Sequence, residues 1–419
     1  MKLIRALIVL LLFGVWANAQ KAEPKTSVFA EIEKMSADLE EITGLHFSKK
    51  VPAAIINKEQ LRKFLDERID VAIKPDDLRA EELTLKMLGL LPQDYDLRAG
   101  TVEMLTEQAA AFYDYKKKKL FILQGENNGG DGDTGGGQQI ALVHELAHAL
   151  ADQNFHLDKY IQDKALNDDS ATARMAVMEG QATWLMTAYM QKSLGGKPEV
   201  PEAVLDLMRR TVEMGATQYD VFSKAPLYVR ESLLFPYTAG ISFQDAVYRK
   251  FGQEAFREVF VRAPVSSQQI LHPEKYLSKQ ESALPPAPSI EKRYRKLAEG
   301  TLGEFDFRVL LEPIAGKEQA AELAAHLKGS RYLLAEHKTE RASSSTPVLS
   351  VISAWDSPDE ARKFFDMYRQ TIRKKSKTFV TATESETLLT GRADAGFFRV
   401  VLTGSSVEST EGLKTKPPE

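Results

Sequence analysis

ALVHELAHALADQNF, residues 141–155, is the stretch that decides most about this chain. On a helix with about 100° per residue, its aliphatic side chains share one broad face. His144, Glu145, His148 and Asp152 fall together on the other side. The stretch therefore predicts a helix that packs its apolar face on the core and turns two histidines toward a cavity.

His144 and His148 are four residues apart, so their rings lie one above the other and can chelate one tetrahedral ion. Glu145 is rotated about 100° from His144, which aims it past such an ion toward a water molecule on it. This is the HExxH arrangement, with two metal ligands and a general base. The alternative is a helix with two surface histidines and a solvated glutamate.

A second stretch, ATARMAVMEGQATWLM (171–186), predicts another helix, with its N-cap around residues 168–170. Glu179 lies there among apolar and small residues, where a charged group needs a partner. A catalytic zinc takes three protein ligands and keeps one open position, so we expect Glu179 to be the third ligand. A solvated helical glutamate is the alternative. Gly180 and Ala182 would let this helix approach another one closely.

His156 is the rival third ligand, although its spacing from His148 fits no known pattern. The metzincin pattern requires a histidine at position 154, where this chain has Asn154, so that class of zinc peptidase is excluded. The chain has no cysteine, so any metal site must use His, Asp and Glu.

The chain begins MKLIRALIVLLLFGVWANAQ, which is typical of a targeting segment. Lys2 and Arg5 form its basic end, and the apolar run 6–17 is too short for a comfortable membrane span. We expect residues 1–19 to be a signal peptide; an uncleaved N-terminal anchor is the alternative. Export without cysteines indicates a bacterial periplasmic or secreted protein with no disulfides and no stable membrane span after cleavage.

The amino-acid composition is that of an ordinary globular protein. The chain is 43% hydrophobic and 27% charged, with a formal net charge of −4. The absence of a strong positive excess argues against nucleic acid as a partner.

The pattern along the chain predicts an α+β protein. Residues 20–300 are expected to form a mostly helical domain that carries a small sheet, with a β-hairpin at 109–124. Residues 289–305 read as a short helical bridge into a small α+β domain at 301–408, for which a ferredoxin-like fold is one candidate. Residues 409–419 are expected to be a disordered tail.

The helix with HELAHAL, followed by a helix with Glu179, resembles the gluzincin class of zinc metallopeptidases, to which thermolysin belongs. A group of exported bacterial HExxH proteins is more similar, over about residues 27–300. That similarity rests on four stretches: FYDYKKKKLFIL (112–123), VHELAHALADQNF (143–155), MEGQAT (178–183) and FPYTAGISFQDAV (235–247).

The resemblance implies one zinc ion per chain, bound by His144, His148 and Glu179, with Glu145 as the general base. The metal would activate a water molecule that attacks a peptide carbonyl, so the expected partner is a peptide or protein substrate. The hairpin would supply an edge strand that binds an extended peptide. Its residues Phe112, Tyr113 and Asp114 would line that edge or simply pack on the core.

The reaction also needs a donor for the developing oxyanion. Tyr237, expected at the start of a helix, and His272, in a polar loop, are the two candidates; each could instead have a purely structural role. Thermolysin relatives often carry an aspartate four residues after the ligand glutamate, where this chain has Thr183. The aspartates that could substitute for it are Asp152, Asp168 and Asp169.

Two other functions are compatible with the same residues. The protein could be a catalytically silent scaffold that binds peptides or envelope proteins, although an intact HExxH argues against lost activity. It could also be a zinc hydrolase of non-peptide substrates, because the motif specifies the metal and the water but not the acyl group.

Overall fold

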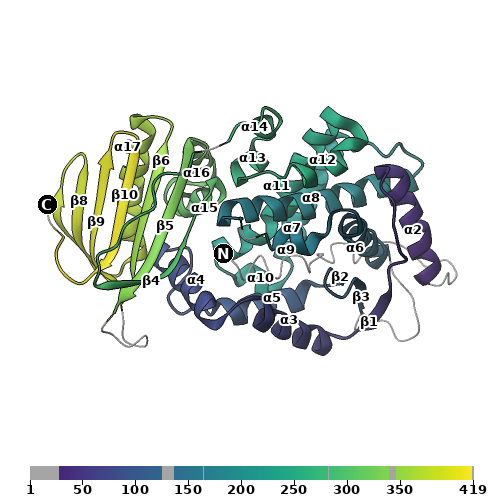
Figure 1. Cartoon of the computed structure of the whole chain (residues 1–419), viewed down its shortest axis with the longest axis horizontal. Coiled ribbons are helices and arrows are strands. Elements are labelled where there is room, and N and C mark those ends of the chain that lie inside the picture. The colour runs from purple at the N-terminus through teal and green to yellow at the C-terminus, as the bar shows by residue number, and fades with distance from the viewer. Residues whose placement is uncertain (1–27, 125–135, 164, 282, 339–345, 418–419) are drawn as a thin grey trace.

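The computed structural model describes the chain in five segments: residues 28–124, 136–163, 165–281, 283–338 and 346–417. The protein is a mixed α+β structure, as expected, with a helical part and a large C-terminal sheet (Figure 1). The predicted signal peptide lies outside the described residues. Among the helices of the described segments, none combines the length and apolar character needed to cross a membrane.

The helical part begins with four helices around a small sheet: α2 (Val28–Thr43), α3 (Lys58–Ala72), α4 (Pro75–Leu88) and α5 (Leu97–Gln108). Asn57 starts α3 with a capping box, and the side chain of Asp96 caps α5. The sheet contains β1 (Ala53–Ile56), β2 (Ala111–Asp114) and β3 (Lys119–Leu123) in the order β1-β3-β2. The predicted hairpin is therefore present as β2 and β3, and β2 is an edge strand.

Three long helices form the centre of the helical part: α6 (Gly136–Phe155), α8 (Asp168–Ser193) and α11 (Leu227–Phe251). Residues 141–152 of α6 are buried on every side, so the expected polar face looks into the protein and not into an open cleft. Shorter helices surround them: α7 (Leu157–Ile161), α9 (Glu202–Thr217), α10 (Asp220–Lys224), η1 (Gly252–Glu254), α12 (Ala255–Val261), α13 (Ser267–Leu271) and α14 (Pro273–Leu277).

The C-terminal part is one seven-stranded antiparallel sheet with the order β4-β5-β6-β10-β9-β8-β7. Helix α17 packs on it, with the ring of Phe364 4.7 Å from that of Trp355. The strands are β4 (Tyr294–Gly300), β5 (Leu327–His337), β6 (Val348–Trp355), β7 (Phe379–Glu384), β8 (Leu388–Ala393), β9 (Gly396–Thr403) and β10 (Ser406–Leu413). The helices are α15 (Glu304–Ala315), α16 (Lys317–Ala324) and α17 (Pro358–Lys375).

Three expectations for this part are wrong. Residues 294–300 form strand β4 and no helical bridge, so the C-terminal domain begins before residue 301. The first five residues of the expected tail, 409–413, belong to β10, which pairs with β6 on one side and β9 on the other. The sheet is not ferredoxin-like. A ferredoxin-like fold contains split βαβ units, in which the two strands joined by a helix are separated by a third strand. Here β4 and β5, which are joined by helices, are adjacent and antiparallel.

The first turn of α8 joins the helical part to the C-terminal sheet. The carboxylate of Asp168 accepts hydrogen bonds from Thr301 N–H (3.2 Å) and from the hydroxyl of Tyr332 (3.3 Å). Asp169 N–H donates to the Thr301 hydroxyl (3.1 Å). Because α8 also carries Glu179, the C-terminal domain is attached to the helix that supplies the expected third metal ligand.

Candidate metal centre

The structure brings His144, His148 and Glu179 together from two packed helices, α6 and α8. The distances are 3.0 Å between the two Nε2 atoms and 3.1 and 3.3 Å from these nitrogens to Oε2 of Glu179. Tetrahedral zinc with bonds of about 2.0–2.1 Å places its ligand atoms about 3.3 Å apart. The three atoms thus form a triangle close to one face of such a tetrahedron, and the group could hold a metal ion.

Burial and mutual attraction set the charges of this triad. Burial lowers the pKa of His144 to about 4, although a hydrogen bond with Glu179 opposes the effect. Burial alone would raise the pKa of Glu179, but the charge of His148 and hydrogen bonds from both histidines lower it to about 2. Glu179 is therefore an anion and His144 a neutral imidazole at neutral pH, which are the forms that bind a metal. Against the effect of burial, the charge of Glu179 raises the pKa of His148, so a metal that binds there would displace the proton of this histidine.

Glu145 lies beside the triad and is only 1% exposed. Its Oε2 accepts a hydrogen bond from the backbone N–H of Tyr113 (2.7 Å) in the edge strand β2. Its Oε1 has no hydrogen-bond partner among the described residues. Burial is the main reason that the pKa of Glu145 rises to about 8. The contact with Tyr113 could not be predicted, since the hairpin signal does not show which backbone group faces the helix.

Tyr237 is the candidate oxyanion donor that the structure places at the triad. Its ring stacks on that of His144, with 6.0 Å between centroids and 26° between planes. Burial, the charges of Glu179 and Glu145 and a hydrogen bond to Glu179 raise the pKa of Tyr237 well above its ordinary value, so the hydroxyl keeps its proton. Tyr237 lies in the middle of α11 and not at its start, because the helix continues through Pro236.

His272 and His156 do not join the triad. His272 contacts Glu304 (3.0 Å) and Glu274 (3.7 Å), and the adjoining helix α13 meets Asp169 at the start of α8. That end of α8 is ten residues from Glu179, or about 15 Å along the helix axis. His156 is exposed and precedes α7 with a φ of 56°.

The aspartates expected to orient the histidines are engaged elsewhere. Asp152 accepts hydrogen bonds from the Tyr113 hydroxyl (2.8 Å), Lys118 Nζ (2.8 Å) and Leu157 N–H (3.0 Å). Asp168 binds the C-terminal domain, as described above. Nδ1 of His144 has no hydrogen-bond partner among the described residues. Asp152 therefore attaches the hairpin to the end of α6, next to the triad.

Comparison with known proteins gives a match for the C-terminal part alone. Residues 292–416 match the family described as a domain of unknown function (DUF8575). Neither the curated proteins nor the solved structures contain a match to the chain. The matched range begins just before β4 and includes every strand of the large sheet, in agreement with a domain boundary near residue 292.

Proposed function

We propose that this chain is an exported, zinc-dependent peptidase of the gluzincin kind, most simply an endopeptidase. The observation that carries the proposal is the buried triangle of His144, His148 and Glu179 with Glu145 beside it. Two imidazoles and one carboxylate are a ligand set that suits zinc and leaves one coordination position open. When bound there, zinc would lower the pKa of a water molecule and polarise a carbonyl group.

The residues of the chain supply the remaining chemistry. Glu145 has one oxygen anchored by Tyr113 N–H. A cation bound at the triad would lower the raised pKa of Glu145 and favour its ionised form, in which Oε1 can accept a proton. Tyr237 retains its phenolic proton and lies against His144, so it can donate a hydrogen bond to a developing oxyanion. Because all these groups are buried, their electrostatic effects are stronger than they would be in water.

The edge strand β2 favours a peptide as the substrate. Ala110 C=O accepts a hydrogen bond from Leu123 N–H (2.9 Å) within the hairpin. Since bonding direction alternates along an antiparallel pair, the backbone groups of Ala111 and Tyr113 point to the free side of β2. An extended peptide could pair with that side of β2. A carbonyl group of the peptide would then compete with the carboxylate of Glu145 for the hydrogen bond from Tyr113 N–H.

The side chains of the hairpin mostly serve the core. Phe112 packs on Phe64 and Phe121, with ring centroids 4.9 and 5.0 Å apart. Asp114 is fully buried and forms an ion pair with Arg68. All four residues of β2 are buried, and their side chains are taken up by the core, so a substrate that paired with β2 would use its backbone alone.

The test combines metal analysis with digestion of an unfolded protein by the purified mature chain. We expect about one zinc per chain in the wild type and in Glu145→Gln. Digestion by Glu145→Gln should be slower by about 10² to 10⁴, the usual contribution of a general base. Glu254→Gln, on the surface of the same domain, is the matched control.

Absence of zinc from the wild type after zinc loading would refute the proposal. Equal digestion by wild type and Glu145→Gln would refute the assigned base. Bound zinc without any digestion would instead favour the peptide-binding scaffold or a hydrolase of other substrates.

A further inference from the structure

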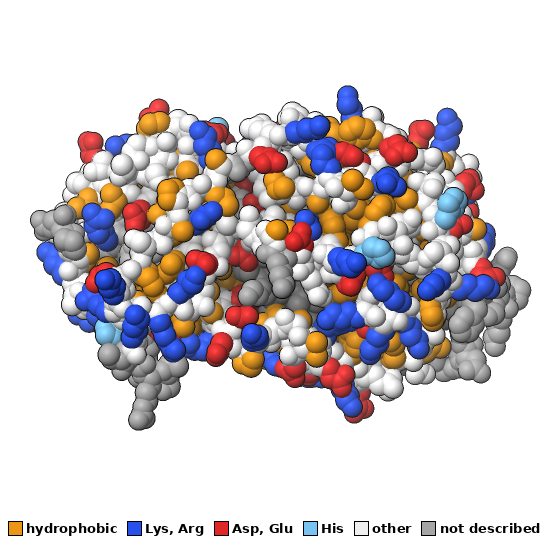
Figure 2. Space-filling model, viewed as in Figure 1, with side chains coloured by type: hydrophobic (Ala, Val, Ile, Leu, Met, Phe, Trp, Pro, Cys, Tyr) orange, Lys and Arg blue, Asp and Glu red, His pale blue; other side chains and the backbone are white. Residues whose placement is uncertain are grey.

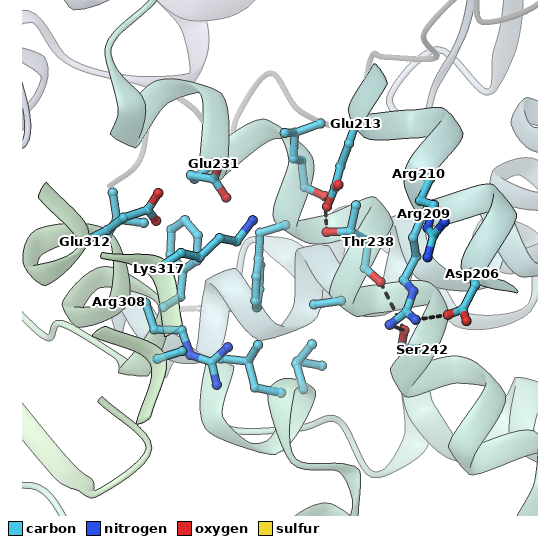
Figure 3. Close-up of a pocket in the computed structure, with 18 of the residues that line it drawn as sticks. Asp206, Arg209, Arg210, Glu213, Glu231, Thr238, Ser242, Arg308, Glu312 and Lys317 are labelled. Atoms are coloured by element: carbon cyan, nitrogen blue, oxygen red, sulfur yellow. Dashed lines mark hydrogen bonds and ion pairs between the residues drawn. The ribbon is translucent and has the colours of Figure 1, made fainter. Parts of the chain in front are cut away.

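Two grooves in the described part of the chain have similar volumes, within the range of about 300–1,000 Å³ that is usual for ligand sites. The first, of about 560 Å³, lies between α9, α11 and α15, and four acidic and four basic side chains line it (Figure 3). Such a balanced lining selects no ligand by its charge. The second, of about 570 Å³, is lined by the end of α3, the hairpin turn, the segment before α8 and the start of α8. It is called the α8 pocket below.

The α8 pocket lies on the face of α8 that carries the third residue of the triad. Ala171 and Met175 line the pocket, and Glu179 follows them at the same four-residue interval. Residues at this interval lie one above the other on a helix. At about 1.5 Å per residue, Met175 is about 6 Å and Ala171 about 12 Å from Glu179 along the helix axis. The pocket therefore begins about one helical turn from the metal centre.

The hairpin places the pocket at a similar distance from the metal centre. Tyr113 N–H binds Glu145, and Tyr115, two residues further along, lines the pocket. Two residues of extended chain span about 7 Å, and their side chains point the same way. An extended peptide that pairs with β2 has this spacing too. If its scissile carbonyl lies at the triad, a side chain about two residues away reaches the pocket.

The buried part of the pocket is largely apolar. Ile73, Tyr115 and Met175 are only 5%, 4% and 3% exposed, and they come from three separate segments of the chain. Ala72 and Ala171 line the pocket at more exposed positions. Burial of an apolar side chain is favourable in proportion to the area removed from water. The pocket therefore suits a large apolar side chain of a peptide.

The charged residues of the pocket are exposed or half-exposed: Asp77, Lys116, Asp163 and Asp168. Three carboxylates and one amine make this outer part unfavourable for an acidic side chain. Asp163 is paired with Arg174 (3.4 Å), and Asp168 is bound to the C-terminal domain. Elsewhere, acidic and basic side chains are interspersed over the face seen in Figure 2, so the charge of that face selects no substrate. Selection by the shape and apolar character of a pocket is then the simpler means.

We propose that the α8 pocket is a substrate subsite that accepts a large apolar side chain, such as leucine, methionine or phenylalanine, about two residues from the scissile bond. The proposal rests on the peptidase function and names its substrate class: extended or unfolded chains with such a side chain at this position. The residues that line the pocket contact the substrate and do not bind the metal.

Isothermal titration calorimetry tests the subsite with the zinc-loaded mature chain of Glu145→Gln, in which cleavage is suppressed. The probes are Ac-Ser-Ala-Ser-Ala-Ser-Ala-Ser-Ala-NH2 and the same peptide with leucine or glutamate as its fourth residue. The repeating background lets the substituted residue find its register. We expect leucine to tighten binding about tenfold, because it buries more apolar surface than alanine. Glutamate should give no gain.

Two variants fill the pocket from different walls, Ala171→Phe on α8 and Ala72→Phe at the end of α3. Each should remove the gain from leucine while zinc content and binding of the parent peptide stay unchanged. Ala203→Phe, at an exposed position of α9, is the matched control and should keep the gain. In digests of an unfolded protein by the chain with Glu145 intact, large apolar residues should be enriched two residues from the cut. Ala171→Phe should lose this enrichment.

The subsite is overturned if the leucine peptide binds no tighter than the parent peptide. It is equally overturned if either phenylalanine variant, with its fold verified by circular dichroism, keeps the gain. Digestion by the wild type without any preference for apolar residues would refute the subsite and support the peptidase function. A gain from leucine without any digestion by the wild type would support the subsite and refute the peptidase function.

Discussion

Gly180 of α8 lies directly against the backbone of Gly240 in α11. A Cβ atom on Gly180 would be 2.2 Å from the carbonyl carbon of Gly240, and one on Gly240 would be 2.3 Å from the carbonyl oxygen of Ala176. Glu179 immediately precedes Gly180, and Tyr237 precedes Gly240 by about one helical turn. The contact of the two glycines is therefore what brings the tyrosine to the third ligand of the triad.

Replacing either glycine by alanine should separate the two helices. Alanine in a helix interior normally stabilises by about 1 kcal/mol relative to glycine. Here we expect Gly180→Ala and Gly240→Ala to lower the free energy of unfolding by about 1–3 kcal/mol, because backbone atoms cannot move aside as side chains do. Urea unfolding measures this, and stabilities equal to or above the wild type would contradict the close approach.

A chelator should destabilise the wild-type protein. A metal that binds only the folded chain adds about 4.1 kcal/mol at a free concentration 1,000 times its Kd. We expect the melting temperature to fall on chelation and to return with zinc. His148→Ala should show no such response; a response as large as that of the wild type would place the metal elsewhere.

Tyr237→Phe should separate catalysis from metal binding. The phenylalanine ring can keep its stacking on His144, whereas the hydroxyl donor is lost. We expect unchanged zinc content and a kcat lower by about 10² to 10³, as for loss of one oxyanion donor. Tyr248→Phe, on the same helix but with its ring tilted against that of Trp184, is the control. An unaltered kcat in Tyr237→Phe would leave the oxyanion donor unassigned.

The C-terminal domain should influence the metal centre through α8. The carboxylate of Asp169 accepts a hydrogen bond from Ser267 N–H (2.8 Å), and its own N–H binds Thr301. Asp169→Ala should cost about 1–3 kcal/mol of stability because it leaves a partly buried N–H group without a partner. It should also weaken zinc binding, measured by competition with a chelating dye. Asp220→Ala, at an exposed position of α10, should change neither quantity.

Glu231→Gln should stabilise the protein at neutral pH but not in acid. The pKa of Glu231 is raised in the folded chain, so folding favours its protonated form. Ionised Glu231 therefore lowers the free energy of unfolding at any pH above its pKa in the folded chain. This loss of stability disappears below its pKa in the unfolded chain, about 4.3. We expect a higher melting temperature than the wild type at pH 7 and an equal one near pH 4. A gain that persists at pH 4 would have another cause.

Local sequence patterns were sufficient for several elements of this protein. The helix of His144 and His148 follows from a 3.6-residue period, and the β2–β3 hairpin from two apolar runs around a lysine-rich turn. The N-cap of helix α17 is equally local, since the hydroxyl of Ser357 accepts a hydrogen bond from Glu360 N–H (3.2 Å) three residues later. Each of these signals depends on residues within a few positions of one another, which is why the sequence alone reveals them.

Other features depend on chain segments that are far apart. Strand β10 is polar in sequence, and only the flanking β6 and β9, with a hydrogen bond from Tyr368 to the buried Glu411 (2.7 Å), make it part of a sheet. The position of Tyr237 likewise depends on two glycines that meet from different helices. The sequence by itself determined which residues could form a metal site. The tertiary structure decided which of them meet. The reason is that packing and burial bring together residues from distant segments, and a local sequence pattern contains no information about such contacts.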